Sequence, residues 1–300
     1  MKNSRWFFIN LFLTLGLSFF LLSSPASALA TNYYVSTTGS DSNTGSQSAP
    51  WKTIQKAADT MVAGDTVMVN AGNYGGDASV FRKVRITKSG SPGQQITYQA
   101  SGTVFTQGFL VSADYITIKG FDVEDPHDAR VKNSTEPDYR GGTGIFIEGS
   151  NDIIEDNYIR GSVWGGIKLS KSGNFLLPSN SIVRNNKLFR NGMSGIEVSG
   201  RNNLIEGNEI WDTIQHHPGN ILSATVTWLD ADGMRFFGQG HIIRKNYIHD
   251  IKVGAPGINL DPSDPNNIYN LNNDYNNDPH IDCFQTWAST STEVASNILF

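Results

Sequence analysis

Hydrophobic and polar positions recur along this chain as one short unit, with little of the periodicity of long helices. Each unit starts with a glycine, has apolar residues at alternate positions after it, and continues through an apolar pair to an asparagine. In the three clearest copies, thirteen positions separate the glycine from the asparagine: Gly144 to Asn157, Gly195 to Asn208 and Gly233 to Asn246. Because alternating residues of a strand point to one side, the unit predicts short strands with one buried face.

Further copies of the unit cover most of the chain. The closest two start 22 residues apart, a length that suits one coil of three short strands. No single coil buries its apolar face alone, so the repeat predicts an all-β solenoid, a parallel β-helix in which coils stack. The looser copies are Gly166 to Asn186 with seven extra residues, Gly108 to Phe121 with no asparagine at its end, and Cys283 to Asn297.

The repeated asparagines have a structural interpretation. If the coils stack, these residues lie above one another at a turn, where their side-chain amides bond coil to coil. The predicted ladder consists of Asn157, Asn186, Asn208 and Asn246.

The segment that begins after residue 30 differs from the repeats. Tyr33 to Val35 has the pattern of a strand, and Gly64 to Val69 would begin the first coil. Between them, apolar residues of segment 51–61 fall on one face of a helix, which we expect to cap the open end of the solenoid. That face consists of Trp51, Ile54, Ala57, Ala58 and Met61.

Residues 1–30 have the pattern of a signal peptide. Lys2 and Arg5 precede an apolar run, and the small residues up to Ala30 suit cleavage after it. The apolar run is slightly long, which leaves an uncleaved membrane anchor as the alternative. We expect a secreted or cell-surface protein in which residues 31–300 form one β-helix domain without membrane contact after cleavage. Because Phe300 lies inside a repeat, we also expect further coils beyond it.

Charge and cysteine content narrow the partners. Without the signal peptide the chain has 21 basic and 28 acidic residues, a net charge of −7, which argues against nucleic acid as a ligand. Cys283 is the only cysteine, so an exported domain has no internal disulfide. We expect its thiol to be a small buried group in a monomeric protein.

Three stretches near the start carry a family resemblance: Tyr33 to Gly45, Ala49 to Ala58 and Gly64 to Tyr74. They resemble the entrance segment of secreted β-helix proteins, above all that of the pectate-lyase-like polysaccharide lyases. The resemblance implies a single-stranded right-handed parallel β-helix with an N-terminal amphipathic helix cap. That superfamily includes lyases, glycoside hydrolases, uronate C5-epimerases and non-enzymatic adhesins, so the fold alone does not select the reaction.

Alignment of the repeats predicts a column of outward side chains. The position two after the leading glycine holds Phe146, Lys168, Glu197, Arg235 and, in the last copy, Gln285. Neighbouring coils lie about 4.8 Å apart, so these side chains would be neighbours on the sheet face where related enzymes hold their sugar chain. We predict Lys168, Glu197 and Arg235 as catalytic residues, with Lys168 or Arg235 as the base. The alternative is a solvated ladder of charges.

A second column predicts a calcium site beside the first. The position before the leading residue is Asp232 in one copy and Asp282 in the next, and Asp230 is close in sequence. Clustered carboxylates bind calcium, which neutralises the carboxylate of a uronate sugar during β-elimination. Asp230-Ala-Asp232-Gly233 resembles the Asp-Gly calcium motifs of one pectate lyase family, although the usual Asp-Asp-Gly run is missing. An Asp before a Gly also commonly caps a turn.

Two long insertions before these copies would wall a groove over the same face. We predict Trp228, His280, Gln285 and Trp287 as substrate-binding residues, because exposed indole rings beside polar groups suit sugar rings. Packing of these loops on the solenoid is the alternative interpretation of the same residues.

The leading functional hypothesis is a lyase that cleaves an acidic, uronate-containing polysaccharide. In a glycoside hydrolase, Glu197 with Asp232 or Asp282 would supply two carboxylates. Asp125-Pro126-His127-Asp128 resembles a motif of alginate C5-epimerases, although it falls in a loop here and is also an ordinary turn sequence. A surface adhesin or carbohydrate-binding module would bind sugar on the same face without catalysis.

Overall fold

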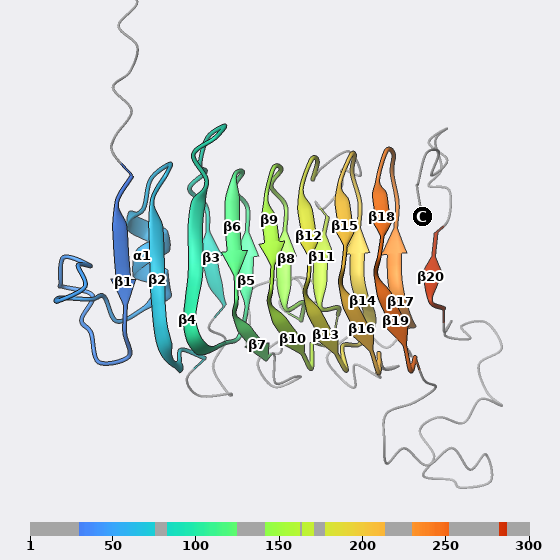
Figure 1. The fold of residues 1–300 in the computed structure, drawn as a ribbon, viewed down its shortest axis with the longest axis horizontal. Helices are drawn as coiled ribbons and strands as arrows, with labels where there is room; N and C mark the ends of the chain where they lie inside the picture. The colour runs from blue at the N-terminus through green and yellow to red at the C-terminus, as the bar shows by residue number, and fades with distance from the viewer. Residues whose placement is uncertain are drawn as a thin grey trace, which may run out of the picture.

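The computed structural model describes residues 30–75, 83–124, 142–162, 164–170, 178–213, 230–251 and 282–286. These residues form a stack of coils that extends from β1 at one end to β20 at the other (Figure 1). Strands of successive coils pair in parallel, and each full coil contributes one strand to each of three faces. The predicted parallel β-helix is therefore confirmed.

The first and second faces form one sheet of 13 strands because a long strand, β4 (Ile96–Thr106), passes through both. The first face continues with β6 (Ile116–Lys119), β9 (Ile153–Glu155), β12 (Ile182–Arg184), β15 (Leu204–Glu206) and β18 (Ile242–Arg244). The second face continues with β7 (Asp122–Glu124), β10 (Tyr158–Arg160), β13 (Lys187–Phe189), β16 (Glu209–Trp211) and β19 (Tyr247–His249).

The third face is a separate sheet of seven strands. It carries the predicted column of outward side chains. Its strands are β3 (Val84–Ile86), β5 (Phe109–Val111), β8 (Ile145–Ile147), β11 (Ile167–Leu169), β14 (Met193–Val198), β17 (Ala231–Phe236) and β20 (Phe284–Gln285).

The entrance of the solenoid has the predicted strand and helix. Strand β1 (Asn32–Val35) pairs with β2 (Thr66–Asn73), which pairs with β4. Helix α1 (Ile54–Thr60) is shorter than the predicted segment, because Thr53 caps its first turn by accepting a hydrogen bond from the Lys56 amide. The helix packs against β3 and β1 and buries its predicted apolar face.

The leading glycines of the repeat are required by close packing. A Cβ atom on Gly195 would lie 2.4 Å from Cγ2 of Ile210 and 2.8 Å from the carbonyl oxygen of Gly233. The same relation holds at Gly144, Gly166 and Gly233, each beside an apolar side chain of the second face. These positions therefore fix the approach of the second face to the third.

The predicted asparagine ladder is present, and it is buried at Asn157, Asn186 and Asn208. Oδ1 of Asn208 accepts hydrogen bonds of 3.0 Å from both the backbone amide and the side-chain amide of Asn186. Its own Nδ2 donates to the Val183 carbonyl at 3.0 Å. Asn157, Asn186 and Asn246 make the corresponding bonds, and the Phe121 amide, where no asparagine stands, donates to Asn157. The turn is thus satisfied coil by coil.

A second polar ladder lies at the turn that leads from the third face into the first, and the sequence did not predict it. Three members accept a hydrogen bond from the backbone amide of the member one coil before, with lengths of 3.1, 2.8 and 3.2 Å, and the first accepts one of 2.8 Å from the Ile116 amide. The residue type changes at every coil, although each member directly precedes the apolar pair of its repeat. The ladder consists of Asp152, Ser181, Asn203 and His241.

Candidate functional site

The predicted column lies on the third face in the predicted register. Lys168 on β11 pairs with Glu197 on β14, Glu197 with Arg235 on β17, and Arg235 with Gln285 on β20. Phe146 on β8 precedes Lys168. The regular spacing of the leading glycines therefore predicted correctly which side chains become neighbours.

The column is enclosed, which differs from the solvated ladder considered as its alternative. Only 8% of Lys168, 7% of Glu197 and 4% of Arg235 is exposed, and Phe146 is fully buried. Charged side chains are rarely buried to this extent unless they are paired. Each of the three makes an ion pair within the column or beside it, which explains how the charges are accommodated.

Lys168 and Glu197 form the first ion pair. Nζ of Lys168 lies 2.8 Å from Oε1 and 2.9 Å from Oε2 of Glu197. The ammonium group thus bonds to both oxygens of one carboxylate. In this enclosed environment each charge of the pair is compensated by the other.

Arg235 binds two carboxylates of its own segment. Its Nε atom donates to Oδ2 of Asp232 at 2.5 Å, and its Nη2 atom donates to Oδ2 of Asp230. Asp232 is fully buried, and this burial raises the pKa of its carboxyl to about 6, while Arg235 opposes the rise. A positive guanidinium therefore occupies the space between the two carboxylates.

Two of the three predicted calcium ligands, Asp232 and Asp282, lie next to each other. The Asp282 amide donates to Oδ1 of Asp232 at 3.2 Å, and the Gly233 amide donates to the Asp282 carbonyl. Among the residues that the structure describes, no three carboxylate, imidazole or thiol groups are gathered as a metal site. Arg235 is bonded to both Asp230 and Asp232, so a calcium ion fits here only after these carboxylates leave the guanidinium. Calcium binding here stays a prediction.

Among the described residues, two buried polar atoms in or next to the column have no hydrogen-bond partner. They are Oε1 of Gln285 and Oγ of Ser194, which lies in register with Asp232. Buried polar atoms are nearly always bonded, so unsatisfied ones next to a charged cluster are natural contacts for a ligand. Ser194 was not among the predicted site residues. Its place in the column of Asp232 is the sequence signal that would have identified it.

Several predicted residues lie outside the described ranges. These are the loop residues Trp228, His280 and Trp287 and the segment 125–128 with its epimerase-like motif. They stay predictions. The prediction for Cys283 was wrong, because the structure has this residue exposed. Its coil is the last one described, so a neighbouring described strand covers it on one side only, that of β17.

Comparison with known proteins gives the family context. Residues 33–203 match the family described as "Pel9A-like, right handed beta helix region". Pectate lyase PEL9 of Emericella nidulans is 26% identical over 235 residues, which are 71% of this chain and 52% of that protein. YwoF of Bacillus subtilis is 31% identical over 139 residues, which are 43% of this chain and 28% of that protein.

A solved structure shows the same fold. The complex of XylC with xylose superposes with a TM-score of 0.53 at 16% identity, covering 73% of this chain and 62% of that one. Of the two relatives compared by sequence, the chain spans about half the length of PEL9 and less than a third of the length of YwoF.

Proposed function

The chain belongs to the Pel9A-like right-handed β-helix family, and from this premise we propose that it is a lyase that cleaves a uronate-containing polysaccharide by β-elimination. The similarity to a pectate lyase supports this substrate class. The observation that carries the proposal is the enclosed Lys168–Glu197 pair with Arg235 on the next strand. It brings a proton-transfer pair and a fixed positive charge together on one sheet face.

The reaction requires three events that these residues suit. The substrate carboxylate must be neutralised, the proton on C5 beside it must be removed, and the C4 oxygen must leave. The guanidinium of Arg235 supplies positive charge against which the substrate carboxylate lies. It is held in place by Asp230 and Asp232, so its position needs no reorganisation during the reaction.

Lys168 and Glu197 move the protons. Lys168 passes a proton to Glu197 across their 2.8 Å contact and then accepts the C5 proton as a neutral amine. The electron pair of the C5–H bond forms the C4–C5 double bond as the C4–O bond breaks. Glu197 returns its proton to the departing oxygen. The pair ends in its starting charge state, and no proton is gained or lost by the protein.

Calcium is kept outside these steps because the described carboxylates face Arg235. If calcium binds, Asp230, Asp232 and Asp282 would hold it, and it would supply charge neutralisation of the substrate carboxylate. The proposal also includes export through the segment 1–30. No helix in the part of the chain that the structure describes is long and apolar enough to cross a membrane.

The test is an ultraviolet absorbance assay of the purified mature protein with pectate, alginate and glycosaminoglycans, each with calcium and with a chelator. A rise in absorbance reports the new C4–C5 double bond. We expect a rise with at least one uronate polymer and none with a neutral glucan. Absence of any rise with every uronate polymer would overturn the lyase proposal.

A glycoside hydrolase is the second candidate, and the state of Asp232 favours it over an adhesin. A carboxyl group with a pKa of about 6 retains its proton more readily than usual and suits a general acid, with Glu197 on the neighbouring strand as the second carboxylate. Release of reducing ends without any ultraviolet absorbance would support this candidate. Absorbance that rises in proportion to reducing ends would exclude it.

A further inference from the structure

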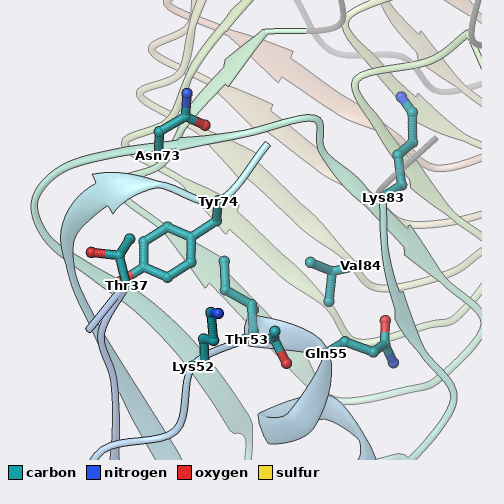
Figure 2. A pocket seen from close by; sticks show the side chains of 9 residues that line it. Thr37, Lys52, Thr53, Gln55, Asn73, Tyr74, Lys83 and Val84 are labelled. Carbon is teal, nitrogen blue, oxygen red and sulfur yellow. The ribbon is translucent and has the colours of Figure 1, made fainter. Parts of the chain in front are cut away.

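A cavity of about 440 Å³ lies at the capped end of the solenoid, away from the column. It is formed where the start of α1, the end of β2 and the start of β3 meet, as Figure 2 shows. Its volume is within the range of small-molecule sites. Its lining residues are Thr37, Lys52, Thr53, Ile54, Gln55, Asn73, Tyr74, Lys83 and Val84.

The walls of this cavity are fixed by hydrogen bonds of their own. Gln55 donates to the Arg85 carbonyl at 3.0 Å and accepts from the Arg85 amide at 2.9 Å. The Tyr74 hydroxyl donates to the Asn70 carbonyl at 2.8 Å, and burial raises its pKa to about 12, so it stays a neutral donor. A ligand would therefore enter a preformed site and would not have to order these side chains.

Lys52 is the group available to a ligand. It is exposed, and its ammonium has no hydrogen-bond or ion-pair partner within the described ranges. Lys83, by contrast, is buried and donates to the Thr143 carbonyl. None of the nine lining residues carries a carboxylate. The cavity thus favours an anionic ligand whose charge lies at Lys52.

The remaining lining suits a sugar ring rather than a small inorganic anion. Tyr74 presents an aromatic ring and Val84 an apolar side chain (Figure 2), and Ile54 adds further apolar surface to the lining. A phosphate or sulfate ion would leave most of the volume empty and the apolar walls without contact. A carboxylated sugar has one charged group for Lys52 and an apolar ring face for Tyr74.

We propose that this cavity is a second, non-catalytic binding site for a uronate unit of the same acidic polysaccharide, an inference that rests on the proposed function for its choice of polymer. Val84 and Ile167, the residue before Lys168, are three paired strands apart on the third face, about 14 Å at the usual strand spacing. One polysaccharide chain that follows the solenoid axis reaches both sites. The cavity would therefore anchor long chains beside the column.

The test is calorimetric titration with trigalacturonate, with neutral maltotriose as the comparison sugar. The titrated protein carries Lys168→Met with Glu197→Gln, which stops the proposed chemistry and leaves neither charge buried alone. Lys52→Gln is introduced into this protein. The matched control is Lys56→Gln, because Lys56 lies on α1 and carries the same charge but does not line the cavity.

We expect trigalacturonate to bind and maltotriose not to bind. Lys52→Gln should weaken trigalacturonate binding about tenfold, the effect of one charge-assisted hydrogen bond, and Lys56→Gln should leave it within about twofold. Equal weakening by both substitutions, or equal binding of both sugars, would overturn the site. Lys52-dependent binding in a protein whose natural sequence shows no lyase activity would overturn only the proposed function. Lyase activity without a Lys52 effect would overturn only this inference.

Discussion

Nζ of Lys168 lies 2.8 Å from Oε1 of Glu197 on the neighbouring strand, and less than a tenth of either residue is exposed. Water cannot compensate either charge there, so each depends on the other. We predict that Lys168→Met or Glu197→Gln alone lowers the free energy of unfolding by about 3 kcal/mol, because each leaves one charge buried alone.

The double variant separates this effect from loss of packing. Lys168→Met with Glu197→Gln should regain most of the lost stability, since two neutral side chains of similar shape replace the pair. Denaturant unfolding of the four proteins gives the coupling energy. Single variants as stable as the natural protein would contradict the enclosed ion pair.

We predict that calcium and Arg235 compete for the carboxylates of Asp230 and Asp232. Its guanidinium bonds Asp230 and Asp232, and both carboxylates must leave it before they bind a metal ion. Arg235→Gln should therefore bind calcium at least about tenfold more tightly than the natural protein, measured by calorimetry. Arg85→Gln is the matched control, because Arg85 is exposed at the far end of the same outward column. Unchanged calcium affinity in Arg235→Gln would show that the two cations do not share these carboxylates.

Because Asp152 is buried, we predict that the stability of the fold depends on pH. Burial raises the pKa of its carboxyl to about 8, and its Oδ2 atom has no hydrogen-bond partner in the described part of the chain. The folded state holds this proton more tightly than the unfolded state. The associated stability is fully present below about pH 4 and is lost as the pH rises through about 8.

Asp152→Asn should remove this dependence. An amide at position 152 cannot ionise, and Asn203, the ladder member two coils on, donates from its amide to the Pro178 and Ser199 carbonyls. We expect the variant to match the natural protein at about pH 4 and to exceed its stability by about 1–3 kcal/mol at about pH 9. Thermal melts across this range test it. A stability difference independent of pH would contradict the account.

The asparagine ladder predicts a large cost for one substitution. Asn208→Ala removes the acceptor of two Asn186 donors and the donor to Val183, all in a buried turn. We expect the free energy of unfolding to fall by about 2–4 kcal/mol in denaturant titrations, since several backbone and side-chain groups lose their partners. Lys187→Ala, on the exposed surface of β13, should change it by less than about 0.5 kcal/mol. Equal effects of the two would refute a structural role for the ladder.

The sequence predicted those features that repeat with one residue type. The leading glycines are needed for close packing, as Gly195 shows, and the short side chain of Asn208 combines an acceptor for Asn186 with a donor to Val183. Their regular spacing sets the register, so the neighbours Lys168, Glu197 and Arg235 followed from alignment of the repeats.

Features that depend on three-dimensional contacts were not predictable in the same way. The second ladder uses Asp, Ser, Asn and His in turn, because any side chain with an acceptor at that height satisfies the backbone amide. The bonds of Arg235 to Asp230 and Asp232 depend on side-chain rotamers. The cavity at Lys52 arises where the start of α1, the end of β2 and the start of β3 meet, which no repeat in the sequence marks.

The measurement that tests the central claim most directly is the initial rate of C4–C5 double-bond formation on a uronate polymer. We predict that the natural protein forms this product and that Lys168→Met with Glu197→Gln reduces the rate at least about a hundredfold while the protein remains folded by circular dichroism. Lys187→Met, an exposed lysine on the second face, should keep the natural rate. A double variant that cleaves as fast as the natural protein would contradict the assignment of the reaction to this pair.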